Sequence, residues 1–123
     1  MQYISDRKRA QGLGAGHAGT HHHWVMMISS ALLLVLVPLF VFTFGIGLGG
    51  SYEEVLAYFG RPFPAIVSAL TLVVVTLHCK AEADEAIIDY VPGVPGKLAL
   101  VAVAALAYVL IAAGLFALVK LAL

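Results

Sequence analysis

The sequence from Trp24 to Leu48 reads WVMMISSALLLVLVPLFVFTFGIGL and contains no charged residue. A helix needs about 20 consecutive apolar residues to cross the hydrocarbon core of a bilayer, and this run is too long for a strand of a soluble protein. Two further apolar runs follow it in the chain. We therefore expect an all-α membrane protein with three transmembrane helices, at about residues 24–48, 63–91 and 97–121, in an anchor domain over 24–123.

The composition of the whole chain agrees with this class and excludes others. Of its 123 residues 62% are hydrophobic, and seven basic residues balance seven acidic ones. A chain without net charge or a long basic block is not expected to bind nucleic acid. Cys79 is the only cysteine, which excludes an intrachain disulfide. The sequence has no glycine-rich dinucleotide fingerprint, no cysteine cluster and no soluble domain to hold a cofactor, so we expect no catalysis by the isolated chain.

The segments outside the three runs are short. Residues 1–23 contain a basic triplet at 7–9 and several glycines, which predicts a loosely ordered, aqueous N-terminal arm in the cytoplasm. After the first run, Ser51 and Glu54 have the spacing of a capping box, in which each side chain accepts a hydrogen bond from the backbone N–H of the other residue. This pair predicts a short interfacial helix over Tyr52–Phe59.

Basic residues divide unevenly between the two ends of the predicted bundle. The arm and the second connection contain five of them, and the opposite side contains two. Because positively charged segments are retained inside, we expect a cytoplasmic (or matrix) N-terminus and a periplasmic C-terminus. The five are Arg7, Lys8, Arg9, Lys80 and Lys97, and the two are Arg61 and Lys120.

The second helix is predicted to remain helical after it stops being apolar. From residue 78 to residue 90 it reads HCKAEADEAIIDY, without glycine or proline. At 3.6 residues per turn, four of its ionisable side chains lie on one face. A charge at membrane depth costs about 3 kcal/mol, so this face must point towards protein or lie beyond the lipid. The four are His78, Glu82, Glu85 and Asp89.

His78 is the candidate metal ligand, because a neutral imidazole in an apolar run can bind a metal or haem iron. An ordinary hydrogen-bonded or interfacial histidine fits the same pattern. Likewise, Tyr90 fits an aromatic anchor at the membrane surface and Asp89 a solvated charge at a helix end. The histidine triplet at 21–23 is not expected to bind a metal, because adjacent side chains point in different directions.

The chain resembles the smaller membrane-anchor subunit of succinate dehydrogenase (respiratory complex II). The resemblance lies in His78 followed, eleven and twelve positions later, by Asp89 and Tyr90 at the end of the second of three helices. The N-terminal sequence agrees with this family. Three short segments resemble the sequence that precedes the first helix in the bacterial, alphaproteobacterial-like branch of the family. They are the basic triplet at 7–9, GLG at 12–14 and GTHHHW at 19–24. The resemblance covers nearly the whole chain.

The resemblance implies a membrane anchor of succinate:ubiquinone oxidoreductase, in the tricarboxylic acid cycle and the electron transport chain. His78 would be one axial ligand of a haem b, and a histidine of a larger cytochrome b anchor subunit the other. Tyr90 would donate a hydrogen bond to ubiquinone, Asp89 would be a polar or proton-relay residue beside it, and His21 would lie near the haem propionates. The implied partners are the larger anchor, an iron–sulfur subunit, a flavoprotein subunit and lipid of the bacterial inner membrane, with the mitochondrial inner membrane as second choice.

Two features depart from the family pattern. Met26-Met27 stands where the family commonly has an arginine, and the segment from Lys80 to Glu85 is charged where the family is apolar. Within that segment, Lys80 and Asp84 are four residues apart and are expected to form an ion pair. Two alternatives stay open: a haem-free fumarate reductase-type anchor, and a small structural or proton-transport subunit whose second-helix carboxylates line an ion path.

Overall fold

The computed structural model describes residues 5–10 and 17–122, and every regular element in this part of the chain is a helix. The short helices are α1 (Asp6–Ala10) and α3 (Tyr52–Phe59), and the long ones are α2 (His17–Gly47), α4 (Pro62–Tyr90) and α5 (Gly93–Ala122). Three segments are long and apolar enough to cross a membrane, namely Gly19–Gly47, Pro62–Tyr90 and Gly93–Ala122. The expected all-α class and the three spans are confirmed.

The first long helix begins earlier than the sequence predicts. α2 begins at His17, whereas the predicted span begins at residue 24. Each residue added to an existing helix gains a backbone hydrogen bond, which offsets the cost of about 1 kcal/mol for Gly19. The expectation of a loosely ordered arm is therefore wrong for α1 and for residues 17–23, and its remainder, 1–4 and 11–16, lies outside the described residues.

The connection between α4 and α5 is also shorter than expected, because only Val91 and Pro92 lie between the two helices. Gly93 adopts a φ of 79°, which turns the chain directly into α5 and is costly for any residue with a Cβ. Pro95 follows in the first turn of α5, where no backbone N–H donor is needed. The segment from 92 to 96 thus starts a helix as well as breaking one.

Gly96 gives the first mutational prediction. It is buried, and a Cβ at this position would lie 2.0 Å from the carbonyl oxygen of Val91, which is backbone and cannot rotate away. Gly96→Ala is expected to lower the free energy of unfolding by about 2 kcal/mol or more, measured by thermal unfolding of the purified protein in detergent. Gly45→Ala is the matched control, because a Cβ there would meet nothing within 4 Å. Equal melting temperatures for the two variants would contradict the prediction.

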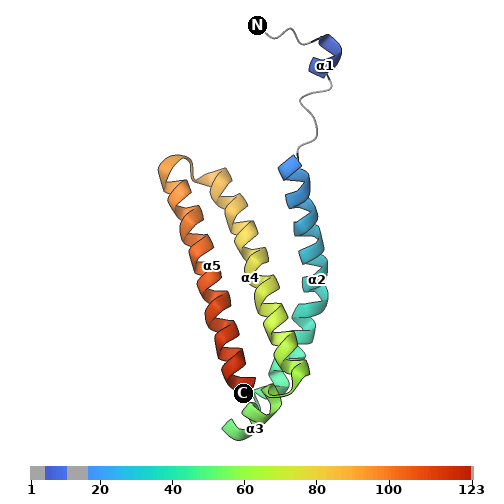
Figure 1. Cartoon of the computed structure of the whole chain (residues 1–123), viewed down its shortest axis with the longest axis vertical. Coiled ribbons are helices and arrows are strands. Elements are labelled where there is room, and N and C mark those ends of the chain that lie inside the picture. The colour runs from blue at the N-terminus through green and yellow to red at the C-terminus, as the bar shows by residue number, and fades with distance from the viewer. Residues whose placement is uncertain (1–4, 11–16, 123) are drawn as a thin grey trace.

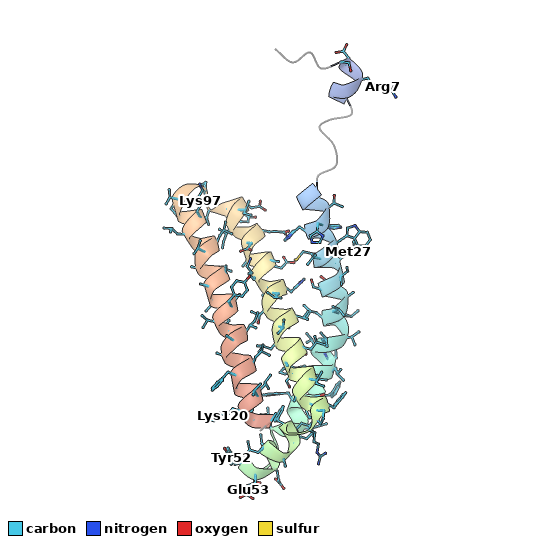
Figure 2. The ribbon with its side chains drawn as sticks, in the orientation of Figure 1. Arg7, Met27, Tyr52, Glu53, Lys97 and Lys120 are labelled. Carbon is cyan, nitrogen blue, oxygen red and sulfur yellow. The ribbon has the colours of Figure 1, made fainter. Side chains whose placement is uncertain are left out.

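α4 is the central helix of the membrane bundle. It packs against both α2 and α5, while no contact joins α2 to α5 within the described residues. The start of α2, the end of α4 and the start of α5 lie at the same end of the bundle, and α3 lies at the other (Figure 1). Figure 2 shows Lys97 at the first of these ends and Lys120, Tyr52 and Glu53 at the second.

α3 is held against the end of α2. The predicted capping box is confirmed: Glu54 N donates to Ser51 Oγ at 3.5 Å, and Ser51 N donates to a Glu54 carboxylate oxygen at 2.8 Å. The Tyr58 hydroxyl donates to the Thr43 carbonyl at 2.9 Å. The end of α2 is therefore tied to α3 by a hydrogen bond in addition to apolar packing.

The bundle buries few apolar side chains. Among the described residues, the buried hydrophobic ones are Leu36, Phe59, Val67 and Ala107. Most apolar side chains of α2 and α5 are exposed, such as Leu34 and Phe116. Surface of this kind is stable only against lipid tails or against another membrane subunit.

Candidate functional site

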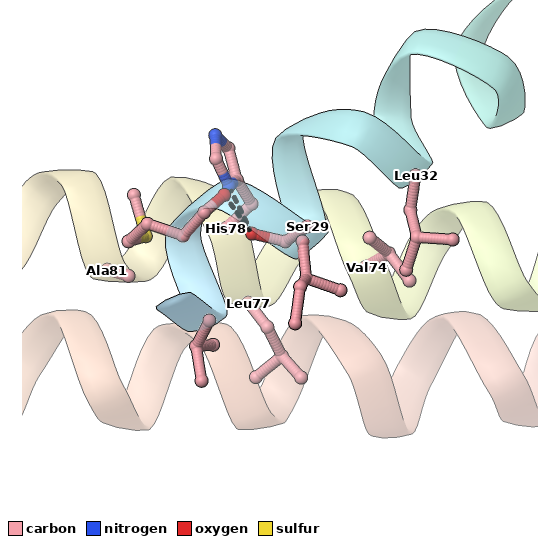
Figure 3. Close-up of a pocket in the computed structure, with 9 residues that line it drawn as sticks. Ser29, Leu32, Val74, Leu77, His78 and Ala81 are labelled. Carbon is pink, nitrogen blue, oxygen red and sulfur yellow. Dashed lines mark hydrogen bonds between the residues drawn. The ribbon is translucent and has the colours of Figure 1, made fainter. Parts of the chain in front are cut away.

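His78 lies on α4 and faces α2. Its Nδ1 is 2.8 Å from the Oγ of Ser29, a residue of α2, and its side chain is 17% exposed. Figure 3 shows the two side chains joined across the contact between these helices. Because α4 is continuous from Pro62 to Tyr90, the packing of α4 on α2 fixes the direction in which the imidazole points.

An apolar groove with a volume of about 270 Å³ lies beside this histidine, which forms part of its wall (Figure 3). Its walls are the facing surfaces of α2 and α4, and Ser29 and His78 are the only polar side chains in its lining. A groove of this kind can accept a flat apolar ligand and offer it one nitrogen donor. The lining residues are Val25, Met26, Ile28, Ser29, Leu32, Val74, Leu77, His78 and Ala81.

The polar face predicted on the second helix does meet protein along part of its length. Glu85 Oε1 lies 2.7 Å from Nε2 of His22 on α2, which is an exposed interhelical contact. Glu82 Oε1 lies 3.8 Å from His78 Nε2, too far for a hydrogen bond. The charged run after His78 is thus partly explained, because α2 carries a histidine opposite Glu85.

The other charged pair of this run points towards α5. Lys80 donates to an Asp84 carboxylate oxygen, so the predicted ion pair is confirmed. Lys80 lines an apolar crevice between α4 and α5 together with Val103 and Leu106. Pairing within one helix lowers the cost of holding both charges beside these apolar side chains.

Asp89 and Tyr90 are the last two residues of α4 and are both exposed, Tyr90 to 83%. Tyr90 is the twelfth residue after His78 along α4, which corresponds to a rise of about 18 Å. The structure therefore places these residues at separate positions along one helix. His21 is exposed near the start of α2, where it lines a shallow groove with Gly19, His22 and Val25.

Within the described residues, no group of three or more His, Cys, Asp or Glu side chains gathers to bind a metal ion. The sequence analysis did not identify Ser29 and His22 as the residues of α2 whose side chains form hydrogen bonds with α4. A serine inside an apolar helix is the sequence signal for an interhelical hydrogen bond, although the sequence does not show which residue the serine bonds.

Comparison with known proteins identifies the family. A family model described as "Succinate dehydrogenase/Fumarate reductase transmembrane subunit" matches residues 1–119. The succinate dehydrogenase hydrophobic membrane anchor subunit of Paracoccus denitrificans is 42% identical over all 123 residues, which cover 95% of that protein. No solved structure matches the chain. These matches confirm the resemblance drawn from His78, Asp89 and Tyr90, and the chain belongs to the succinate dehydrogenase/fumarate reductase transmembrane subunit family, as a membrane anchor of the succinate dehydrogenase type.

Proposed function

We propose that this chain is the smaller anchor of a succinate:ubiquinone oxidoreductase of the bacterial inner membrane, sharing a haem b and the ubiquinone-reduction site with a larger anchor subunit. The observation that carries the proposal is His78, a largely buried imidazole in an apolar groove of a membrane bundle. Beyond the bundle, an iron–sulfur subunit and a flavoprotein subunit would dock at the end of α4. The chain itself oxidises no succinate.

The residues present fit a haem shared between two subunits. His78 of this chain would supply one nitrogen ligand to the haem iron, and a histidine of the larger anchor would supply another. Haem supplies a one-electron carrier inside the membrane, while this chain supplies one ligand and an apolar wall. Met26 and Met27 cannot neutralise haem propionates, so the propionates would rely on His21 and on cations of the other subunit.

Tyr90 and Asp89 are proposed to form this chain's part of the quinone site. The phenol donates a hydrogen bond to a ubiquinone carbonyl oxygen, and this bond strengthens as the oxygen gains negative charge during reduction. Reduction of the quinone to the quinol consumes two electrons and two protons, one proton on each oxygen, and Asp89 is proposed as a polar or proton-relay residue near the quinone. Both side chains are exposed in the isolated chain, as residues covered by a partner subunit would be.

The location of the helix ends supports a cytoplasmic quinone site. Lys97 lies at the same end of the bundle as the start of α2 and the end of α4, and Lys120 lies at the opposite end (Figure 2). Positively charged residues are retained on the cytoplasmic side of a membrane. The surplus of basic residues at the end of α4 therefore favours a cytoplasmic Tyr90 and a periplasmic C-terminus.

One experiment separates this proposal from its alternatives. The complex is purified through a tag on this chain, its other subunits are identified, and a dithionite-reduced minus oxidised spectrum is recorded. We expect a second membrane subunit, an iron–sulfur protein and a flavoprotein, together with the bands of a b-type haem. The same subunits without those bands would indicate the haem-free fumarate reductase-type anchor, whose family description the chain also matches. Purification without any of these subunits would favour a structural or proton-transport role.

A further inference from the structure

Ser29 is the polar residue that α2 presents to His78. Its hydroxyl oxygen lies 2.8 Å from His78 Nδ1 in a contact that is partly buried. The neighbouring Ser30 is exposed, and its hydroxyl donates to the Met26 carbonyl at 2.9 Å. Of these two adjacent serines, only Ser29 bonds the candidate ligand.

The hydrogen bonds of Ser29 indicate which ring nitrogen of His78 carries the proton. The Ser29 hydroxyl donates to the Met26 carbonyl at 3.0 Å and has one hydrogen to give. In the arrangement in which this hydrogen goes to the carbonyl, the Ser29 oxygen accepts from Nδ1 of His78, so that Nδ1 carries the proton and Nε2 keeps its lone pair. Glu82 does not compete for Nε2, because its carboxylate is 3.8 Å away and its side chain is 60% exposed.

We propose that Ser29 is a positioning residue that holds His78 in the tautomer and ring orientation in which Nε2 can ligate iron. This inference rests on the proposed function, in which His78 binds haem b. Residues that accept the second N–H of a ligating histidine fix its orientation and raise its basicity, and their loss typically costs about 10- to 100-fold in metal affinity. A more basic ligand favours the ferric state, so Ser29 lowers the haem potential.

The test compares Ser29→Val with Ser29→Thr in the purified complex. Valine and threonine have the same shape, and only threonine keeps the hydroxyl, so a difference between them reports the hydrogen bond rather than packing. In Ser29→Val we expect haem to dissociate about 10- to 100-fold more readily in detergent, with a raised midpoint potential and an altered highest g value of the ferric haem. Ser29→Thr is expected to stay close to the wild type. Ser30→Ala is the control that removes a hydroxyl without touching His78.

Two results would overturn the inference. If Ser29→Val and Ser29→Thr give the same potential, g value and haem loss, then Ser29 does not position the ligand. His78→Ala, measured in parallel, separates this failure from failure of the proposed function. If His78→Ala loses haem while Ser29→Val and Ser29→Thr behave alike, only the role of Ser29 is rejected. If the haem of His78→Ala is unchanged, the role of Ser29 and the proposed ligation by His78 are both rejected.

Discussion

Replacing His78 with alanine is expected to lower the haem b content of the purified complex to less than about a tenth of the wild-type value. The histidine is the one nitrogen-bearing side chain among the residues that line the groove between α2 and α4. Alanine would remove this chain's ligand to the haem iron and open an apolar space that water or detergent can enter. The reduced-minus-oxidised spectrum and the haem-to-protein ratio measure the effect.

His22→Ala is the matched control for this prediction. It removes an imidazole from the other side of the α2–α4 contact, where His22 bonds Glu85 at 2.7 Å in an exposed position. An exposed polar contact between side chains contributes at most about 1 kcal/mol, so we expect a normal haem spectrum. If both variants retain haem, the ligand is not His78; if both lose it, the contact between the helices rather than ligation accounts for the loss.

Replacing Tyr90 with phenylalanine is expected to lower succinate:ubiquinone reductase activity about 100- to 1,000-fold, as loss of a donor to a developing oxyanion does. Oxidation of succinate with an artificial acceptor is expected to stay normal, because that reaction does not reach the quinone site. Phenylalanine keeps the aromatic body at the end of α4 and removes only the hydroxyl. The ratio of the two activities in membranes is therefore the measurement that isolates the phenol.

Tyr108→Phe is the control for Tyr90→Phe. Tyr108 is also exposed, but it lies within α5, away from the end of α4. It is expected to leave both activities unchanged. Unchanged quinone turnover in Tyr90→Phe would reject the proposed role of the phenol and leave Tyr90 as an aromatic anchor at the membrane surface.

The number and type of the long helices could be predicted because length and hydropathy alone distinguish a membrane span from other structures. Their ends could not be predicted as well. The start of α2 at His17 depends on the gain from continuing an existing helix, which a local pattern of glycines does not report. Similarly, the start of α5 depends on the positive φ of Gly93, a property of one tight turn.

The candidate site, like the helices, could be predicted from the sequence only in part. Helical periodicity was enough to group His78 with Glu82 and Glu85 and to infer that their face needs protein neighbours. Which neighbours they meet depends on the rotation of α2 about its own axis, and the near-uniform hydrophobicity of α2 does not specify it. Only the packed structure shows Ser29 opposite His78 and His22 opposite Glu85.

The two-residue connection between α4 and α5 has a consequence for how water reaches the proposed quinone site. A longer loop could fold over Tyr90 and act as a lid, as loops do in many soluble enzymes. A connection of only two residues, Val91 and Pro92, is too short to reach back over the preceding turn of α4. We therefore expect water at the proposed quinone site to be excluded by residues outside this connection, such as those of a docked subunit, rather than by movement of the connection itself.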